Sequence, residues 1–361
     1  MSLQHGEHGE HGEHGEHGES TRGPGSAALM SAALMRTRDA IVGTEMINPP
    51  PAHAGHLDLA ARLPRLAREY RNAVLISELL EDLAFVAEDD NPPGKTARAM
   101  TVSRRKTGAA LEYLPLVRIA RPDVADFSQA APLVAAYAEL RGDRLAEITV
   151  QQQYLIPFLA SILPIDPVRN PALAEMLEVG LDLVTPVVMR VKLALGCPRP
   201  NQFSDRIQPI IPEPAHPSLP SGHATQIFTL ATMLALLENP AATVKADSQI
   251  YRLACRIAIN RTVAGVHFPA DSAAGAVLGI QLGRYLMARG LKTDVGSAEF
   301  DGRQFRDAAG PRDFHYAILD RMVTGQDSAT DFKNDATAPR PAPLWRSLCE
   351  RAQQEWGNRW S

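Results

Sequence analysis

Residues 220–237 read PSGHATQIFTLATMLALL, and the interpretation of the whole chain starts from this stretch. Ser221 comes directly before a long apolar run. Serine is a favoured N-cap because its hydroxyl accepts a backbone N–H of the first helical turn. The run predicts a helix over 224–237, which Asn239-Pro240 ends. The start of such a helix presents free N–H groups to an anion, and Gly222 would let a ligand approach the backbone closely.

A pair of cations precedes this helix. Lys192 lies in the last turn of a predicted helix that Gly196 and Pro198 end, and Arg199 follows just beyond. A Lys–Arg pair at a helix C-terminus commonly complements the helix dipole and need not bind a ligand. The pair alone therefore does not predict a site.

A third cluster follows the helix. Arg261 lies at the end of one predicted helix, and another starts at Pro269, a residue favoured at the first helical position. His267 precedes that start, and Asp271 lies in the first turn. The Asp271 carboxylate can accept one ring N–H of His267, which would fix the tautomer and leave the other ring nitrogen available for attack or coordination.

The three clusters supply different parts of one site. Each has a structural explanation of its own, as a dipole complement, a helix cap or a helix start. Together they offer three cations, two imidazoles, a hydroxyl and backbone N–H groups, which suit a tetrahedral oxyanion such as phosphate or vanadate. We predict that distant helix ends converge on one oxyanion site made of Lys192, Arg199, Ser221, Gly222, His223, Arg261, His267 and Asp271.

The order and spacing of these residues form a pattern, Lys192-x6-Arg199-Pro200, then Pro220-Ser221-Gly222-His223, then Arg261-x5-His267-x3-Asp271. This pattern resembles the signature of the type 2 phosphatidic acid phosphatase and vanadium haloperoxidase superfamily. The resemblance covers residues 192–271 and implies an all-α helical bundle. One departure is Asn260, where the family usually has serine before the arginine; that position mostly supports the loop.

The resemblance also implies a role for each residue. Lys192, Arg199 and Arg261 would bind the oxyanion, together with Ser221 and the Gly222 N–H. His267 would be the nucleophile of a phosphatase, or the axial ligand of vanadate in a haloperoxidase. His223 would be the general acid–base, and Asp271 would orient His267.

The context of the second cluster bears on the choice between the two activities. Residues 214–225 read PAHPSLPSGHAT, which looks more like haloperoxidases. His216 falls where bromoperoxidases of the family have a second active-site histidine, although a structural histidine in a proline-rich loop is an equal alternative. Against haloperoxidase, the chain after its N-terminal repeats is short for that branch.

We therefore expect a vanadium-dependent haloperoxidase, specifically a bromoperoxidase, with vanadate as its cofactor. It would oxidise halide with hydrogen peroxide to hypohalous acid, which halogenates an organic acceptor, through peroxo-vanadate bound at His267. The alternative is a soluble acid phosphatase that acts on phosphomonoesters through a phosphohistidine at His267, with phosphate in the same site. An anion-binding protein without turnover is the third class, but it would be expected to lack a catalytic histidine.

Composition and charge exclude few classes of protein, but they agree with an oxyanion site in an otherwise nearly neutral chain. The 361 residues carry a formal charge of −4, and five of the acidic residues lie among the first nineteen, so the rest of the chain is close to neutral. Such a balance gives no reason to expect nucleic acid, and it concentrates positive potential at one site. The three cysteines show neither zinc spacing nor a disulfide framework.

The remaining segments set the expected organisation. Five His-Gly-Glu repeats at 5–19 indicate a purification tag, although a metal-binding tract has the same composition. We expect a tag and linker over 1–26, an N-terminal arm over 27–57, a catalytic helical bundle over 58–290, and a loop-rich extension with a final helix over 291–361.

Helical spacing of apolar residues dominates the predicted bundle. It includes 73–86 and 95–119, and a basic run at Arg104-Arg105-Lys106 is expected on a solvated helix face. No segment has the roughly eighteen uncharged apolar residues that a bilayer span needs, so we expect a soluble protein without a membrane span. Its location stays open between cytoplasm and periplasm, and the apolar helices are compatible with a homodimer.

Overall fold

The computed structural model describes residues 24–41, 58–89, 96–108, 110–308 and 310–360. The His-Gly-Glu repeats and residues 42–57 of the predicted N-terminal arm therefore lie outside the described residues. The chain divides into two compact units, residues 1–71 and 72–361. The predicted oxyanion site lies entirely in the second unit.

The first unit holds short helical elements, and α3 crosses the boundary between the units. These elements are α1 (Pro24–Ala40), α2 (Leu59–Arg62), the 3-10 helix η1 (Leu63–Arg65) and α3 (Arg68–Leu80). Asp58 caps α2, because its side chain accepts the backbone N–H of Ala61 at 2.7 Å. Asp58, the first residue of the predicted bundle, is thus a helix N-cap, although α1 already forms a helix in the region predicted as linker and arm.

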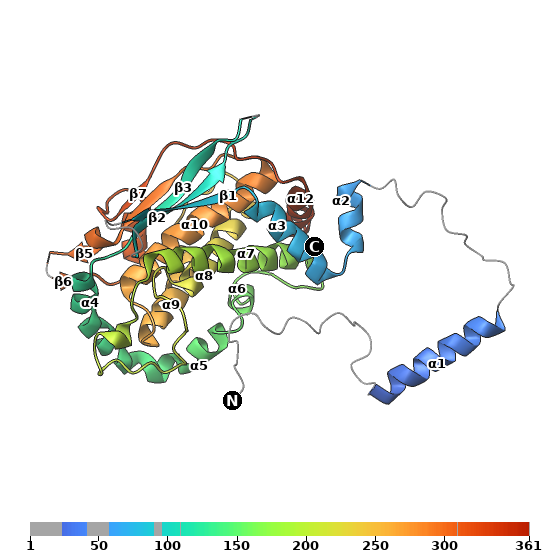
Figure 1. Cartoon of the computed structure of the whole chain (residues 1–361), viewed down its shortest axis with the longest axis horizontal. Coiled ribbons are helices and arrows are strands. Elements are labelled where there is room, and N and C mark those ends of the chain that lie inside the picture. Colours follow the sequence, from blue (N-terminus) through green and yellow to red (C-terminus); the bar gives the residue numbers. More distant parts are fainter. Residues whose placement is uncertain (1–23, 42–57, 90–95, 109, 309, 361) are drawn as a thin grey trace. The chain divides into compact units, whose positions relative to one another are not determined.

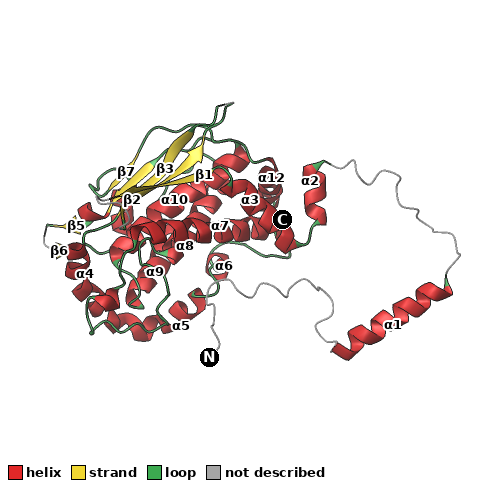
Figure 2. Ribbon diagram, viewed as in Figure 1, coloured by secondary structure: helices red, strands yellow, loops and turns green. Residues whose placement is uncertain are grey.

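The second unit contains most of the helices and all the described strands (Figure 2). Its helical elements are α4 (Val124–Ala136), η2 (Tyr137–Leu140), α5 (Arg141–Gln151), α6 (Ile156–Ala160), α7 (Pro171–Leu195), η3 (Pro200–Gln202), α8 (Gly222–Glu238), α9 (Gln249–Val263), α10 (Pro269–Leu291), η4 (Gly302–Gln304), α11 (Tyr316–Val323) and α12 (Pro343–Gly357). Its strands are β1 (Leu83–Asp89), β2 (Ala97–Arg105), β3 (Tyr113–Ala120), β4 (Ala298–Asp301), β5 (Arg306–Asp307), β6 (Gly310–Pro311) and β7 (Thr330–Phe332).

A five-stranded mixed sheet covers one side of the helices. Its strand order is β1-β2-β3-β4-β7, with β3 and β4 parallel and every other neighbouring pair antiparallel. Figure 1 shows the sheet lying along α7 and α10, and β2 contacts α7 while β3 and β4 contact α10. Gln281 of α10 joins the two layers, since its Nε2 donates to the carbonyls of Leu116 at 2.9 Å and Gly296 at 2.8 Å.

The all-α prediction is therefore wrong. Segments 73–86 and 95–119, interpreted as helices, contain the end of α3 followed by β1, β2 and most of β3. β2 has no sequence pattern typical of a strand. It lies between β1 and β3 and against α7, so most of its side chains are buried and polar and apolar residues do not alternate. A short apolar run of this kind cannot be distinguished from a buried helix by periodicity.

The basic run also lies in a different environment from the one expected. Arg104 belongs to β2 and is 1% exposed, and its Nη2 donates to the Val295 carbonyl at 2.5 Å and to the Thr337 hydroxyl at 2.8 Å. The solvated helix face predicted for it is absent. The guanidinium instead ties the sheet to the C-terminal segments.

The helix ends around the predicted site agree with the sequence. α7 ends at Leu195, and Gly196 adopts the left-handed conformation (φ 57°) that glycine tolerates. Ser221 is the N-cap of α8, with its side chain accepting the Ala224 N–H, and Pro269 opens α10. The final helix, α12, is also confirmed, and it packs against α7 and α10.

α8 and α10 pack unusually closely through a row of glycines on α10. A Cβ added at Gly275 would lie 2.7 Å from the Ser221 carbonyl oxygen, and one at Gly279 would lie 2.5 Å from the Thr225 carbonyl oxygen. Gly283 continues the row against Thr232. Since no side chain separates the helices there, their N-terminal ends are held at a fixed separation.

The close packing yields a stability prediction. Gly279→Ala should lower the free energy of unfolding by about 1–3 kcal/mol, because the new methyl group overpacks a backbone contact. Urea unfolding followed by circular dichroism measures this, with Gly142→Ala as the control, since a Cβ there meets nothing within 4 Å. The control should stay within about 0.5 kcal/mol of the parent. Equal stability of both variants would contradict the packing account.

Candidate oxyanion site

The predicted site residues come from four helix ends that meet within the second unit. Lys192 lies at the end of α7, and Arg199 lies in the loop that follows. Ser221 and His223 begin α8, while Arg261 ends α9 and leads into α10. Figure 1 shows α7, α8, α9 and α10 gathered under the sheet. The residues that lie far apart in sequence are thus brought together by helix packing.

Lys192 is fully buried and holds the loop that precedes α8. Its Nζ donates to the carbonyls of Pro217 at 2.7 Å and Ser218 at 2.8 Å. Its charge also acts on the nearby His267 and Asp271, because it lowers the pKa of both. The ammonium group therefore both anchors the loop and contributes positive potential to the site.

Arg199 contacts two of the predicted site histidines, His216 in the loop before α8 and His267 in the third cluster. Its Nη1 donates to the Val266 carbonyl at 2.7 Å and lies 3.4 Å from Nε2 of His267. Its Nη2 lies 3.0 Å from Nδ1 of His216, and its Nε and Nη2 donate to the His216 carbonyl. A guanidinium only donates, so Nε2 of His267, which faces Arg199, carries no hydrogen. Nδ1 of His216 lies between this donor and an acceptor, the Pro217 carbonyl 3.2 Å away.

His267 is oriented from its other side by Asp271. Its Nδ1 lies 3.0 Å from Oδ2 of Asp271, and the same oxygen accepts the Phe268 N–H at 2.9 Å. The Ser218 hydroxyl lies 3.4 Å from Oδ1 of Asp271, and it shares its one hydrogen with the nearer Pro198 carbonyl at 2.7 Å. With Nδ1 bound to the carboxylate and Nε2 facing Arg199, the tautomer is defined: the hydrogen is on Nδ1, and the Nε2 lone pair points into the site.

Burial and charge keep this imidazole neutral. Burial of His267, which is 3% exposed, lowers its pKa well below the ordinary histidine value, and the positive charges of Arg199 and Lys192 lower it further. Burial raises the pKa of Asp271, while the Phe268 N–H and the charges of Lys192 and Arg199 lower it. An unprotonated imidazole is the form that can act as a nucleophile.

The start of α8 supplies the second imidazole and an open stretch of backbone. His223 is half-buried, and its Nε2 donates to the Gln151 carbonyl at 3.0 Å. A Cβ built on Gly222 would meet no atom within 4 Å, so the space beside this backbone is open to a ligand. The sequence predicted such an approach at Gly222.

Arg261 carries the clearest sign of a missing acceptor. It is 1% exposed, and its Nη2 donates to the Ile148 carbonyl and to Oε1 of Gln151, both at 3.2 Å. Its Nε and Nη1 are buried and have no acceptor among the described residues. Burial lowers its pKa to about 10, which leaves the group charged at neutral pH. Buried donors without acceptors are costly, and a phosphate or vanadate oxygen would satisfy them.

Two contributors to the site were not predicted. Gln151, at the end of α5, contacts both Arg261 and His223, and Ser218 connects Asp271 to the Pro198 carbonyl. Gln151 lies in a polar stretch, QQQ at 151–153, without any motif. Ser218 lies in the loop quoted above, two residues before Pro220, where its hydroxyl gave no separate signal.

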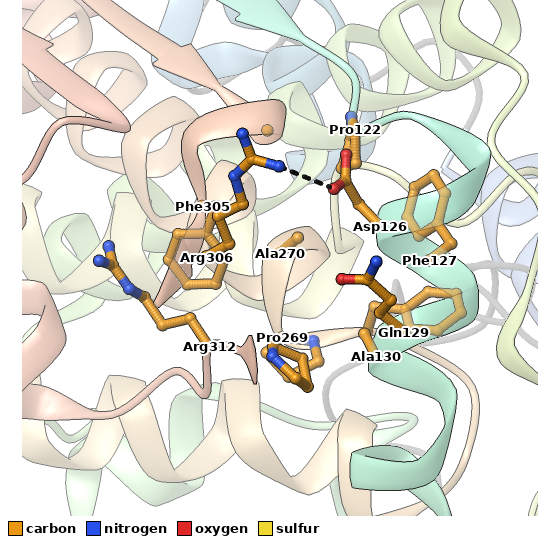
Figure 3. A pocket seen from close by; sticks show the side chains of 13 residues that line it. Pro122, Asp126, Phe127, Gln129, Ala130, Pro269, Ala270, Phe305, Arg306 and Arg312 are labelled. Carbon is orange, nitrogen blue, oxygen red and sulfur yellow. Dashed lines mark ion pairs between the residues drawn. The ribbon is translucent and has the colours of Figure 1, made fainter. Parts of the chain in front are cut away.

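A separate pocket lies at the start of α10, on the side of Phe268 rather than His267. Figure 3 shows Pro269 and Ala270 at its base, with Arg306 opposite Asp126, whose carboxylate lies 4.0 Å from the guanidinium. Phe268 itself packs against Phe127, with ring centroids 4.9 Å apart and ring planes tilted by 44°. None of the predicted site residues lines this pocket, so it is distinct from the oxyanion site.

Comparison with known proteins agrees with the motif. Residues 173–292 match the family model of the PAP2 superfamily, which confirms the resemblance over a segment that includes all three clusters. This match supports the phosphatase alternative and gives no specific support to haloperoxidase. No curated protein matches the chain.

Among solved structures, the chain is similar to a transmembrane PAP2-type phosphatidylglycerolphosphate phosphatase from Bacillus subtilis. Sequence identity is 17%, the alignment covers 46% of this chain and 94% of that one, and the TM-score is 0.27. In the described part of the present chain, no helix combines the length and apolar character needed to cross a bilayer.

The unsatisfied donors of Arg261 yield a binding prediction. Arg261→Met keeps much of the side-chain volume but removes the charge, and it should weaken the binding of inorganic phosphate by about 10- to 100-fold. Isothermal titration calorimetry measures the dissociation constant. Arg252→Met is the matched control on α9, because Arg252 pairs with Asp247 on the surface. Unchanged phosphate binding by the Arg261 variant would remove this residue from the site.

Proposed function

We propose that this chain, whose residues 173–292 match the PAP2 superfamily, is a phosphatase that hydrolyses phosphomonoesters through a phosphohistidine at His267. The observation that carries the proposal is the arrangement of this imidazole. Asp271 binds Nδ1, and Nε2 lies 3.4 Å from a guanidinium nitrogen of Arg199. This arrangement supports a role for neutral His267 as a nucleophile, beside a cation that would bind the group under attack.

In the first step the Nε2 lone pair of His267 attacks phosphorus, and the bond from phosphorus to the ester oxygen breaks. The electron pair of that bond leaves with the oxygen, which takes a proton and departs as an alcohol. The attacking imidazole becomes positively charged, and the Asp271 carboxylate stabilises that charge through the Nδ1 hydrogen.

His223 is the proton donor in this proposal. Its Nε2 carries a hydrogen, because the Gln151 carbonyl that it contacts can only accept. Since Nε2 of His223 keeps its contact with Gln151, protonated His223 gives its Nδ1 hydrogen to the leaving oxygen and becomes neutral. In the second step, neutral His223 takes a proton from water, which attacks the phosphohistidine and releases inorganic phosphate.

The cations stabilise the charge that spreads over the phosphoryl oxygens. Arg199 and Arg261 are nearly fully buried, where their interaction with an anion is stronger than in water. Arg261 has buried N–H groups to give to these oxygens. Ser221 and the Gly222 N–H add neutral donors at the start of α8, where the helix dipole also favours negative charge.

Vanadate has the shape and charge of phosphate, so the same residues would hold it, with His267 as the ligand. Bound vanadate would supply the activation of hydrogen peroxide that a haloperoxidase requires. The buried donors of Arg261 fit either anion. The superfamily match favours the phosphatase, and we expect vanadate to act on this chain as an inhibitor that competes with phosphate.

A paired assay tests the choice of activity. We expect hydrolysis of p-nitrophenyl phosphate without vanadate, and no bromination of phenol red with vanadate, bromide and peroxide. His267→Ala should lose at least about a hundredfold in the rate of hydrolysis, since no other group replaces the nucleophile. Bromination without hydrolysis by the unmodified protein would contradict the proposal, as would hydrolysis that survives His267→Ala.

The depressed pKa of His267 gives a pH prediction with a definite sign. Lys192 lowers this pKa, so Lys192→Met should raise it towards the ordinary value. Protonation inactivates the nucleophile, so the acid limb of the kcat/KM profile should move to higher pH in the variant. Measuring both proteins with one substrate cancels the titration of the substrate itself. A limb that stays in place or moves to lower pH would contradict the assignment of His267.

A further inference from the structure

Gln151, the last residue of α5, contacts two residues of the oxyanion site from outside the motif-bearing stretch. It is 1% exposed. Its side-chain Oε1 accepts from Nη2 of Arg261 at 3.2 Å, and its main-chain carbonyl accepts from Nε2 of His223 at 3.0 Å. One buried residue therefore holds both a predicted anion-binding group and the predicted acid–base group.

The orientation of the Gln151 amide is set by its neighbour Asn260. Nδ2 of Asn260 donates to Oε1 of Gln151 at 3.1 Å and to Oε2 of Glu147 at 3.0 Å, while Oδ1 accepts from Arg144 at 3.1 Å. A carboxylate only accepts and a guanidinium only donates, so these two partners fix which end of the Asn260 amide faces which way. The Asn260 amide must then present N–H to Gln151.

Glu147 is itself held as an acceptor. Arg256 donates to both of its carboxylate oxygens, at 2.9 Å from Nε and 2.5 Å from Nη2. The hydrogen bond from Arg256 lowers the pKa of Glu147, which keeps the carboxylate ionised. We call Glu147, Asn260 and Gln151 the amide chain. Asn260 donates to both of the others, and Oε1 of Gln151 accepts from Asn260 on one side and from Arg261 on the other.

The amide chain gives a reason for asparagine at position 260. The two hydrogens of its Nδ2 reach Glu147 and Gln151 at once. A serine hydroxyl, usual at this place in the family that the motif resembles, has a single hydrogen and could serve only one of them. Without that contact the Gln151 amide is free to turn, and its NH2 group would then face the Arg261 guanidinium, two donors against each other.

We propose that Gln151 is a positioning residue of the oxyanion site: it holds Nη2 of Arg261, so that Nε and Nη1 stay available for the bound anion. Both atoms are buried and have no acceptor among the described residues. Its own Nε2 is also a buried donor without an acceptor there, next to the same guanidinium. The inference rests on the proposed function for the identity of the anion.

The test uses inorganic phosphate as the probe and needs no turnover. Gln151→Met preserves the length of the side chain and removes the acceptor, and it should weaken phosphate binding about tenfold in calorimetry, the usual effect of losing a hydrogen bond to a charged group. Gln153→Met is the matched control, since Gln153 is exposed two residues along. Unchanged phosphate affinity in Gln151→Met would overturn the proposal, even if its melting temperature fell.

A double-mutant cycle separates positioning from general destabilisation. If Gln151 acts through Arg261, Gln151→Met should cause no further loss of phosphate affinity in protein that already carries Arg261→Met. An equal loss in both backgrounds would overturn the proposal. Asn260→Ser tests the same contact should Gln151→Met not fold: phosphate binding should weaken in the parent and stay unchanged in the Arg261→Met background.

The cycle also distinguishes this inference from the proposed function. A protein that hydrolyses no phosphomonoester but shows the non-additive loss of phosphate affinity would retain Gln151 as a positioning residue and reject the phosphatase. A protein that hydrolyses phosphomonoesters normally but loses phosphate affinity additively in the cycle would retain the phosphatase and reject Gln151 as a positioning residue.

Discussion

The contact between α8 and α10 is the constraint on which the site depends. Gly275 and Gly279 allow the two backbones to meet without an intervening side chain. At the N-terminal end, the Ser221 N–H donates to the Asp271 carbonyl at 2.9 Å. One helix carries the predicted acid–base group and the other follows the predicted nucleophile, so their spacing decides whether His223 and His267 serve one bound group.

The charges of the site are satisfied to different degrees, and the differences suggest a division of labour. Lys192 donates to two loop carbonyls, and Arg199 donates to three carbonyl groups and faces two imidazoles. Both side chains therefore hold the loop between α7 and α8 in place, and both add positive electrostatic potential to the oxyanion site. Arg261 keeps buried donors without acceptors, which costs free energy in the absence of an anion. Within the oxyanion site, these N–H groups are available to a bound anion.

Local signals in the sequence were sufficient for the helix ends that carry the site. Gly196, Ser221 and Pro269 each end or begin a helix for a reason that lies within a few residues, and all three were predicted correctly. The contact between His267 and Asp271 also follows from their spacing on a helix start. His216 lies beside Arg199, as its resemblance to a second active-site histidine suggested, but its role stays a prediction.

Longer-range features could not be obtained in the same way. β2 is buried between two strands and α7, so its sequence has no alternation to distinguish it from a helix, and the fold class was predicted wrongly. Gln151 reaches Arg261 only because α5 packs on α9, a contact that no local pattern encodes. The activity itself depends on which anion the converging cations accept, and phosphate and vanadate are too alike in shape and charge for sequence to separate them.

Trapping of the covalent intermediate tests the central claim most directly. Protein mixed with a phosphomonoester is quenched in alkali, where a phosphorus–nitrogen bond survives, and the phosphoryl group is located by mass spectrometry and phosphorus NMR. The account predicts one phosphoryl group on Nε2 of His267, because Nδ1 is bound to Asp271. Turnover with no phosphoryl group on the protein, or with the group on another residue, would contradict it.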